Sequence, residues 1–173
     1  MLWAGNILVM IFENLIKENK DAFINKVIDV ANYLEVKPEH LMFLMWFETG
    51  HTLDSTIQNS IGATGLIQFM PKTAIGLGTT TDKLKQMTNV EQMEFVKKHL
   101  SQFKGKYKDY VDLYCGIFWP MAVGKPDTFQ IGNEIVAKQN PLFVKKGDKV
   151  IFKSGIRQAL KKQIPLQYAD MFA

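Results

Sequence analysis

The sequence predicts a mainly α-helical protein that folds as a single domain over residues 1–173. Apolar residues recur at helical spacing in most segments, and proline and glycine stand where those segments end. Alternation of apolar and polar residues never runs far enough to predict a large sheet, and neither repeats nor low-complexity linkers divide the chain. A chain of 173 residues has the length of one ordinary domain and can bury a core without disulfides.

The chain begins with an apolar run from Ile7 to Phe12, for which we expect a core helix with Asn6 near its cap. The run is too short to span a bilayer. It also lacks basic residues before it and a small-residue cleavage site after it, so we expect no secretory signal peptide. The sequence therefore predicts a protein that is made in the cytoplasm and has no membrane span.

Two longer helices should follow. Beyond Asp21, apolar residues recur at the spacing of one helix face, at Phe23, Ile24, Val27, Ile28, Ala31 and Leu34. Pro38 suits the first turn of the next helix, and Gly50 suits its C-terminal stop. Residues 51–70 have little helical period and many turn formers, which indicates a loop. Pro71 can then open a short helix, which the run GLGTTT breaks.

Helices are also expected in the second half of the chain. Thr88 and Glu91 have capping-box spacing, which predicts a helix with an apolar stripe of Met93, Val96, Leu100 and Phe103. The next helix should end at Pro120 and carry on one face Tyr107, Tyr110, Val111 and Tyr114. Beyond it, GNEIVAKQNPLF and SGIRQALKKQI predict short helices, and DKVIFK predicts one short strand.

The charge of the chain is moderately positive. Its 21 Lys and Arg residues against 17 Asp and Glu give a net charge of +4, which suits an anionic partner such as nucleic acid, a membrane surface or a cell-wall polymer. The lysines are scattered in short clusters, as expected for a solvated face. Because the sequence has no basic helix interleaved with stacking aromatic residues, we expect no nucleic-acid partner.

Metal ligands and reactive thiols are not indicated by any motif. The single Cys115 lies in an apolar run and is interpreted as a small buried group. His40, His51 and His99 are too far apart for a local metal motif. The lysine-rich segment near the C-terminus offers only Asp148 as an acidic ligand, so we expect no calcium site. No metal and no cofactor are predicted.

Glu48 is the clearest candidate for chemistry. It follows Met45, Trp46 and Phe47 at the end of an apolar helix and faces a polar loop. A carboxyl group among apolar side chains is harder to ionise, and a general acid has to hold its proton near neutral pH. On spacing alone, the alternative is an ordinary glutamate that ends a helix and points to water.

Glu48 and the run GATGLIQFMPKTA (residues 62–74) resemble a known signature. Lytic transglycosylases of the soluble-lytic-transglycosylase type, in the lysozyme superfamily, have Glu-Ser at a helix end, a loop, and then Gly-Ala-x-Gly-Leu-Met-Gln-x-Met-Pro-x-Thr-Ala. Here Thr49 replaces the serine and Ile67 replaces the first methionine. The resemblance covers residues 38–120. It implies a lysozyme-like, goose-type fold, with residues 121–173 as a helical and loop extension.

The resemblance also implies roles for single residues. Glu48 is implied to be the catalytic acid and base, and Asn59 or Ser60 to hydrogen-bond an N-acetyl group or a hydroxyl of the sugar. Asn59 stands where the family commonly has a serine, and the loop before Gly62 is slightly longer than usual.

Three further residues are implied to bind the substrate. Gln68 and Met70 are implied to line the groove, and Tyr114 to position the bond beside the acid. Each has a structural alternative: Met70 and Tyr114 as packed core residues, and Gln68 as a partner of backbone groups only. The implied partner is the glycan strand of peptidoglycan, without metal or cofactor.

One carboxylate suffices for the reaction that the resemblance implies. The N-acetyl group of the substrate assists departure, and the 6-hydroxyl of the muramyl sugar attacks to give a 1,6-anhydro ring. The alternative is a muramidase that uses water, as most glycosidases do with two carboxylates. Asp54 is then the nearby helper, although an Asx-turn in the loop is the simpler interpretation of that residue.

A second alternative is not enzymatic. The family usually has Ala-Tyr-Asn-Ala-Gly where this chain has Leu113, Tyr114 and Cys115, so the asparagine is lost. A wall-binding or virion structural module that kept the groove without turnover fits that loss. The tyrosine followed by an apolar run and Pro120 is similar to phage-encoded relatives. We therefore expect an enzyme of a phage or mobile element that acts on the cell wall, released at lysis or carried with other virion proteins.

Overall fold

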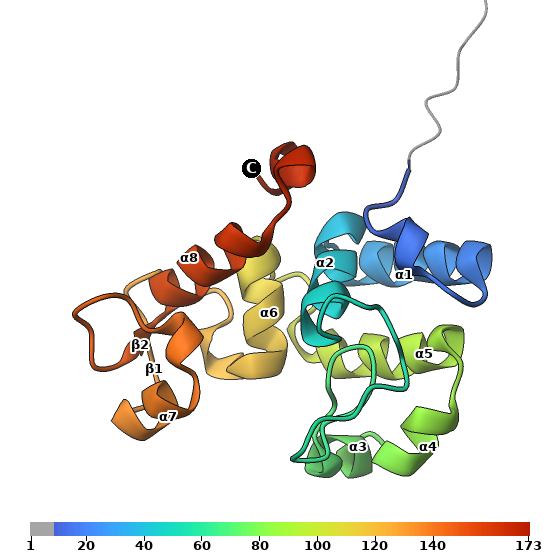
Figure 1. The fold of residues 1–173 in the computed structure, drawn as a ribbon, viewed down its shortest axis with the longest axis horizontal. Helices are drawn as coiled ribbons and strands as arrows, with labels where there is room; N and C mark the ends of the chain where they lie inside the picture. Colours follow the sequence, from blue (N-terminus) through green and yellow to red (C-terminus); the bar gives the residue numbers. More distant parts are fainter. Residues whose placement is uncertain (1–8) are drawn as a thin grey trace, which may run out of the picture.

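The structure, a computed structural model, describes residues 9–173 and is mainly helical (Figure 1). Its α-helices are α1 (Lys20–Leu34), α2 (Pro38–Glu48), α3 (Pro71–Gly76), α4 (Thr81–Gln86), α5 (Asn89–Leu100), α6 (Tyr110–Phe118), α7 (Glu134–Gln139) and α8 (Lys153–Gln163). Short 3-10 helices are η1 (Glu13–Leu15), η2 (Ser101–Phe103), η3 (Pro120–Ala122), η4 (Pro141–Phe143) and η5 (Leu166–Phe172). Two strands, β1 (Gln130–Ile131) and β2 (Ile151–Phe152), pair antiparallel, with Gln130 opposite Phe152.

Helix α2 is the central element. Every residue from His40 to Trp46 is buried, and the helix packs against both α1 and α6. A helix that is apolar all round is stable only inside a core. It begins at Pro38, as the sequence predicts, and ends at Glu48. The helix lies between α1 and α6 (Figure 1).

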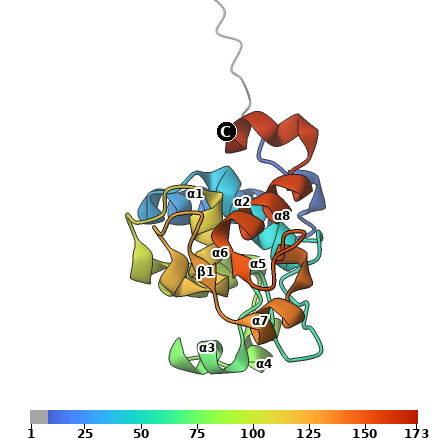
Figure 2. The ribbon, with the colours of Figure 1, turned by 90° about the vertical axis from the view of Figure 1, so that its left-hand side faces the viewer.

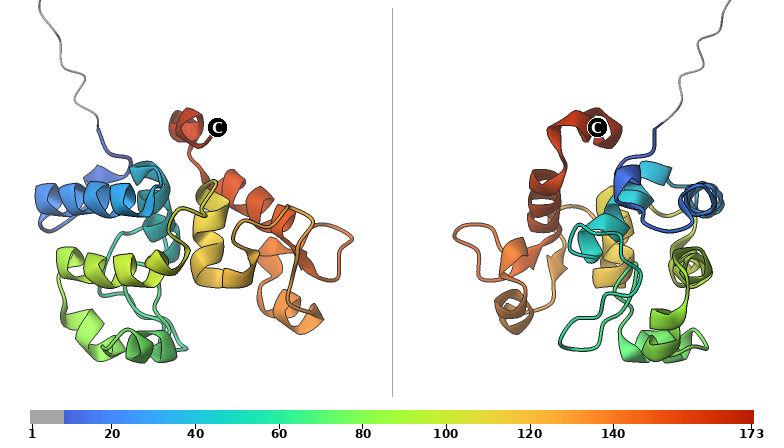
Figure 3. Two further views of the ribbon diagram at one scale, coloured as in Figure 1. Left: turned by 180° about the vertical axis from the view of Figure 1, so that it is seen from behind. Right: turned by 45° about the vertical axis from the view of Figure 1, so that its right-hand side comes forward.

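Helices α1 and α5 form two stacked layers on one side of the molecule, with α3 and α4 beyond them (Figure 3). The predicted capping box at the start of α5 is confirmed. Thr88 Oγ1 accepts a hydrogen bond from the Glu91 amide at 3.2 Å, and Glu91 Oε2 accepts one from the Thr88 amide at 2.7 Å. The box fixes where α5 begins.

The C-terminal segments pack on the other side of α6 and then return to α2. Helix α8 contacts α6, β2 and η4. Beyond α8 the chain turns and continues into η5 (Figure 2). Phe172 in η5 stacks on His40 and meets Phe43 edge to face, with ring centroids 5.1 and 5.2 Å apart. One cluster of buried apolar residues extends from Met10 to Leu160, so all of these elements share a core.

Buried charges hold this C-terminal part in place. Lys153 at the start of α8 and Asp112 in α6 form an ion pair in which both side chains are almost inaccessible to solvent. The ammonium group also donates to the carbonyls of Ala122 and Lys125, at 3.1 and 2.7 Å. Asp112 Oδ1 accepts from the Gly124 amide at 2.9 Å. Every polar atom of the pair therefore has partners, as a buried ion pair requires.

A second ionic contact lies beside it. The Arg157 guanidinium binds both carboxylate oxygens of Asp127, at 2.8 and 3.0 Å, and one oxygen of Asp109 at 2.6 Å. Asp109 in turn caps α6, because its other oxygen accepts from the amides of Val111 and Asp112. Helix α8 is thus tied to the start of α6 and to the turn before β1.

Several predicted boundaries are wrong. Asn6 and Ile7 lie outside the described residues, but Ile11 and Phe12 form a turn where we predicted a helix, and η1 follows. Phe12 has a left-handed φ of 60°, which interrupts a helix, although its side chain is buried in the core as expected. Helix α6 begins at Tyr110, because Asp109 caps it, so Tyr107 precedes the helix that was predicted to include it.

The other departures are additions. Helix α4, capped by Thr80, and strand β1 were not predicted, whereas the short strand in DKVIFK is confirmed. Both additions are short and carry few apolar residues, so they have almost no periodic signal. Within residues 9–173, none of the helices combines the length and the apolar character that a bilayer crossing requires.

Candidate functional site

Glu48 is the last residue of α2, and its side chain is half-buried. Desolvation by the surrounding protein raises the pKa of this carboxyl from 4.5 to about 8. Within residues 9–173 no group donates a hydrogen bond to it that would favour the charged form. The carboxyl is therefore protonated at neutral pH and still reachable by solvent, which are the two properties of a general acid.

Tyr114 lies near Glu48 and packs among aromatic rings from α2, α6 and η4. Tyr114 in α6 meets Phe47 edge to face at 5.6 Å, stacks on Phe118 at 5.6 Å, and contacts Phe143 at 5.5 Å. Burial raises the pKa of the Tyr114 hydroxyl well above its usual value, and the nearby Glu48 charge raises it further. The structure therefore brings Tyr114 to Glu48, and its hydroxyl stays protonated as a hydrogen-bond donor.

The chain reverses direction directly after Glu48, and the buried Thr49 holds the reversal. Its hydroxyl donates to the Met45 carbonyl at 2.7 Å and accepts from the Leu53 amide at 2.8 Å. The hydroxyl thus ends α2 and starts the segment that we name the Glu48 loop, residues 49–70. A threonine in place of the serine of the resembling family keeps this bond, because only the hydroxyl takes part in it.

The Glu48 loop descends from the end of α2 to a tip near α3 and returns (Figure 1). Isolated β-bridges join Gln58 to Thr64 and Thr64 to Phe69. Gly62 and Gly65 both have φ of 83°, a left-handed conformation that favours glycine. These conformations explain why both positions of the GATG run are glycine.

Asn59 and Ser60 lie at the exposed tip of the loop. The Asn59 side-chain oxygen accepts from the amides of Ile61 and Ala63, at 3.1 and 3.0 Å, so it shapes the turn. Within the described residues no hydrogen bond joins either side chain to Glu48. The proposed sugar contacts of Asn59 and Ser60 stay predictions.

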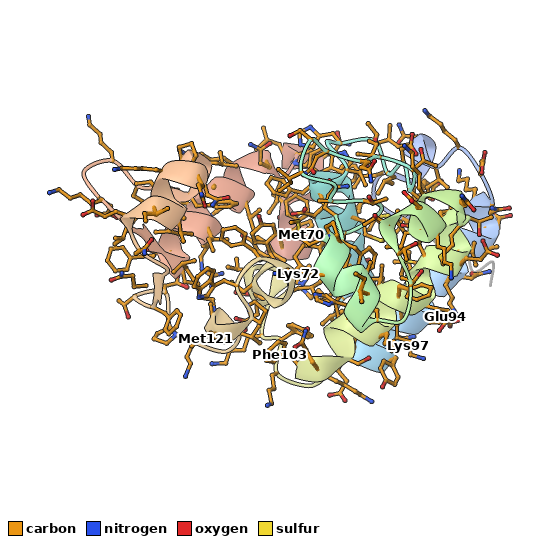
Figure 4. The ribbon with its side chains drawn as sticks, turned by 90° about the horizontal axis from the view of Figure 1, so that it is seen from below. Met70, Lys72, Glu94, Lys97, Phe103 and Met121 are labelled. Atoms are coloured by element: carbon orange, nitrogen blue, oxygen red, sulfur yellow. The ribbon has the colours of Figure 1, made fainter. Side chains whose placement is uncertain are left out.

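Gln68 and Met70 lie together in the returning limb of the loop. They line one small cavity with Thr73, His99 of α5 and Ile117 of α6. Figure 4 shows Met70 at the start of α3 on the side toward α6, and its side chain is exposed. Gln68 Nε2 donates to the carbonyls of Gly65 and Ile57, at 3.1 and 3.3 Å, so part of this side chain serves the loop itself.

Asp54 is the other carboxylate in the Glu48 loop. Its Oδ1 accepts from the Thr56 hydroxyl at 2.7 Å and from the Thr56 amide at 2.8 Å, the pattern of an Asx-turn. These bonds lower the pKa of Asp54 below its usual value. At neutral pH Asp54 is therefore ionised, whereas Glu48 holds its proton. The protein shifts the pKa values of the two carboxyl groups in opposite directions.

No chemical role was predicted for Cys115 or His99. Cys115 is fully buried, and burial raises the pKa of its thiol, so it is a packed apolar group. His99 is half-buried in the cavity beside Gln68, and burial lowers its pKa. Among the described residues no three His, Cys, Asp or Glu side chains gather as metal ligands would.

Gln92 in α5 was missed by the sequence reasoning, although its side chain hydrogen-bonds to Ser55 and Leu66 in the Glu48 loop. A signal for it exists: it stands one residue before Met93, on the stripe that also carries Val96 and Leu100, so it is a polar residue on a buried face. The rings of Phe118 and Phe143 were also missed, because their packing on Tyr114 depends on how α6 and η4 meet.

The chain matches no model of a known protein family, no curated protein and no solved structure.

Proposed function

We propose that this chain is a lytic transglycosylase with a lysozyme-like fold, which cleaves the β-1,4 bond between N-acetylmuramic acid and N-acetylglucosamine in peptidoglycan. The observation that carries the proposal is the Glu48 carboxyl, held protonated up to a pH of about 8 at the end of a buried helix. The Tyr114 ring beside it and the GATGLIQFMPKTA run after it support the same assignment.

The proposed reaction uses one protein carboxyl group twice. Glu48 gives its proton to the glycosidic oxygen as the bond from that oxygen to C1 of the muramyl sugar breaks, assisted by the N-acetyl oxygen of the substrate. The 6-hydroxyl oxygen then bonds to C1, and its proton goes to the Glu48 carboxylate. The acid is regenerated, no water is consumed, and the product ends in a 1,6-anhydro ring. A carboxyl with a pKa near the working pH suits both transfers.

The electrostatic setting of Asp54 favours this reaction over hydrolysis. An inverting hydrolase needs a second carboxylate that activates water. Asp54 is ionised, but the two hydrogen bonds from Thr56 to its Oδ1 lower the pKa of the carboxyl and so make it a weaker base toward water. Mass spectrometry of products from purified peptidoglycan tests the choice. We expect muramyl products that are lighter by one water than hydrolytic ones, and reducing muramyl ends would establish the muramidase instead.

One observation favours a non-catalytic alternative. Cys115 occupies the position after Tyr114 where the resembling family usually has asparagine, and it is fully buried, so no amide is supplied there. The chain would then be a wall-binding or virion structural module. Zymography and co-sedimentation with purified peptidoglycan separate the two functions. A binding module sediments with the polymer but leaves no clearing in the zymogram.

The place of action follows from the proposed substrate. The chain would act on the cell wall as an enzyme of a phage or mobile element, released at lysis or carried with other virion proteins. The genes beside it test this assignment: phage structural or lysis genes are expected, and housekeeping genes would contradict it.

A further inference from the structure

Gln92 is a fully buried polar side chain near the start of α5, and its side-chain hydrogen bonds go to residues outside the helix. Its Nε2 donates to the Ser55 carbonyl at 2.6 Å and to the Leu84 carbonyl at 2.7 Å. Its Oε1 accepts from the Leu66 amide at 3.0 Å. A single amide group therefore joins the outgoing limb of the Glu48 loop, its returning limb and the end of α4.

The backbone of the loop lies directly against this amide. A Cβ added to Gly65 would be 2.4 Å from Gln92 Oε1, closer than atoms can approach. The Gly65 carbonyl in turn accepts the Gln68 side chain at 3.1 Å. A continuous series of contacts thus runs from Gln92 through Gly65 to Gln68, and Met70 lines the same cavity as Gln68.

None of these bonds reaches the acid itself. Glu48 stands on α2 and the loop start is held separately by Thr49, through its bonds to Met45 and Leu53. The part of the site that holds the proton and the part proposed to hold the sugar are therefore fixed by different elements. A change at position 92 should disturb the second and leave the first intact.

We propose that Gln92 is a positioning residue that holds the Glu48 loop in the shape in which Gln68 and Met70 receive the glycan. The contact with the glycan rests on the proposed function; the hold on the loop does not. A side chain of similar size without the amide would fill the same space but leave the Leu66 amide and the Ser55 carbonyl without partners, and the Leu84 carbonyl with the Met87 amide alone. Buried backbone groups seldom tolerate that loss, so the loop would move.

The first test compares Gln92→Leu with Gln86→Leu, an exposed glutamine at the end of α4. For cleavage of solubilised peptidoglycan we expect Gln92→Leu to raise KM about tenfold and to change kcat less than about threefold, which corresponds to lost substrate binding without lost chemistry. Gln86→Leu should change neither. A fall in kcat with unchanged KM, the result of a smaller folded fraction, would overturn the proposal.

The second variant, Gln92→Glu, keeps the size and the acceptor for the Leu66 amide. As a neutral acid it can donate one hydrogen bond, whereas as a carboxylate it faces the Ser55 and Leu84 carbonyls with no donor. We therefore expect near-normal KM at pH 5 and a KM that rises several-fold more than that of the unmodified protein between pH 5 and 8. If Gln92 only fills space, the KM of Gln92→Glu and the KM of the unmodified protein should depend on pH in the same way.

Amide hydrogen exchange tests the hold on the loop without any activity. We expect Gln92→Leu to speed exchange at Leu66 and its neighbours at least tenfold, with α1 and α2 unchanged. Equal exchange in the loop would refute the positioning role. If Gln92→Leu does not fold, exchange in Gln92→Glu at pH 5 and pH 8, corrected for the intrinsic rate, decides the same question. A protein that cleaves no peptidoglycan yet loses loop protection would refute the proposed function and keep the positioning role.

Discussion

The Glu48 loop and the C-terminal third, residues 121–173, are held to the rest of the protein in different ways. Neutral hydrogen bonds to Thr49, Asn59 and Gln92 hold the loop. Ion pairs hold the C-terminal third: Lys153 pairs with Asp112 inside the core, and Arg157 pairs with Asp127 and Asp109.

The difference follows from the charges that each region can carry without changing the pKa of Glu48. A loop beside a carboxyl that must stay protonated is best built without lysine or arginine, as residues 49–70 are, because a nearby cation would lower the pKa of Glu48. The C-terminal third has no such restriction, and paired charges fix it firmly to α6. The comparison predicts that substitutions in the two regions have separate consequences, activity for one and stability for the other.

Glu48→Gln should have the largest effect on activity, and the variant should still fold. The amide keeps the size of the side chain but cannot transfer the proton, so we expect activity on peptidoglycan to fall by at least ~10²–10⁴-fold. Turbidity clearing and product analysis measure it, and Glu39→Gln on the same helix is the control. Near-normal clearing by the folded variant would contradict the role of Glu48.

Lys153→Met should have the largest effect on stability. It leaves Asp112 charged and buried without its partner, which costs about 3–5 kcal/mol and lowers the melting temperature by roughly 10 °C. Adding Asp112→Leu should recover much of the loss, since apolar side chains can replace a buried ion pair. Lys161→Met, exposed on the same helix, is the control, and an equal loss there would argue against a special role for the buried pair.

The pH dependence of Glu48 links the two readouts. The folded protein holds this proton up to a pH of about 8, whereas a pKa of 4.5 applies to the unfolded chain. The contribution of Glu48 to stability is therefore fully present below pH 4.5 and is lost as pH rises through about 8. Solvent reaches the half-buried group and reduces the effect, so we expect Glu48→Gln to be about 1–3 kcal/mol more stable than the unmodified protein above pH 8 and equal to it near pH 4. Denaturant titrations measure this difference.

The pH dependence of the activity of the unmodified protein should report the titration of the same Glu48 carboxyl. Because the acid must be protonated to act, kcat/KM should fall as pH rises through about 8. A profile that falls instead near pH 4–5, the ordinary range of a solvated glutamate, would show that burial does not hold the proton.

Thr49→Val should lower both activity and stability, each by less than the substitutions above. The valine leaves the buried Leu53 amide without its acceptor at the start of the loop, which we expect to cost about 1–2 kcal/mol and to lower activity several-fold. Thr49→Ser should behave as the unmodified protein, and Thr128→Val, at an exposed turn of the C-terminal third, should change little. Thermal melts and clearing assays would both have to stay unchanged in Thr49→Val to contradict this.

Asp54→Asn should have the smallest effect. The amide oxygen can still accept from Thr56, so the Asx-turn survives, and we expect most of the activity to remain. Loss of activity by a hundredfold or more, without loss of stability, would favour the two-carboxylate hydrolase.

Much of the molecule was determined by the sequence itself, wherever the physical cause is local. Pro38 and the Thr88–Glu91 box set helix starts, because caps act on neighbouring amides. Gly62 and Gly65 mark left-handed turns, because only glycine adopts them without strain. Glu48 was placed at a helix end because Gly50, which suits a C-terminal stop, follows it so closely.

Only the tertiary structure decided what those elements do to one another. The pKa of Glu48 depends on the protein that encloses it, with Tyr114 and the rings behind it coming from α6 and η4, far along the chain. The bonds of Gln92 and the pairing of Lys153 with Asp112 likewise join residues that no local pattern connects. Desolvation and buried pairing act through space, so they depend on which segments meet, whereas caps and turns act along the chain and can be read from it.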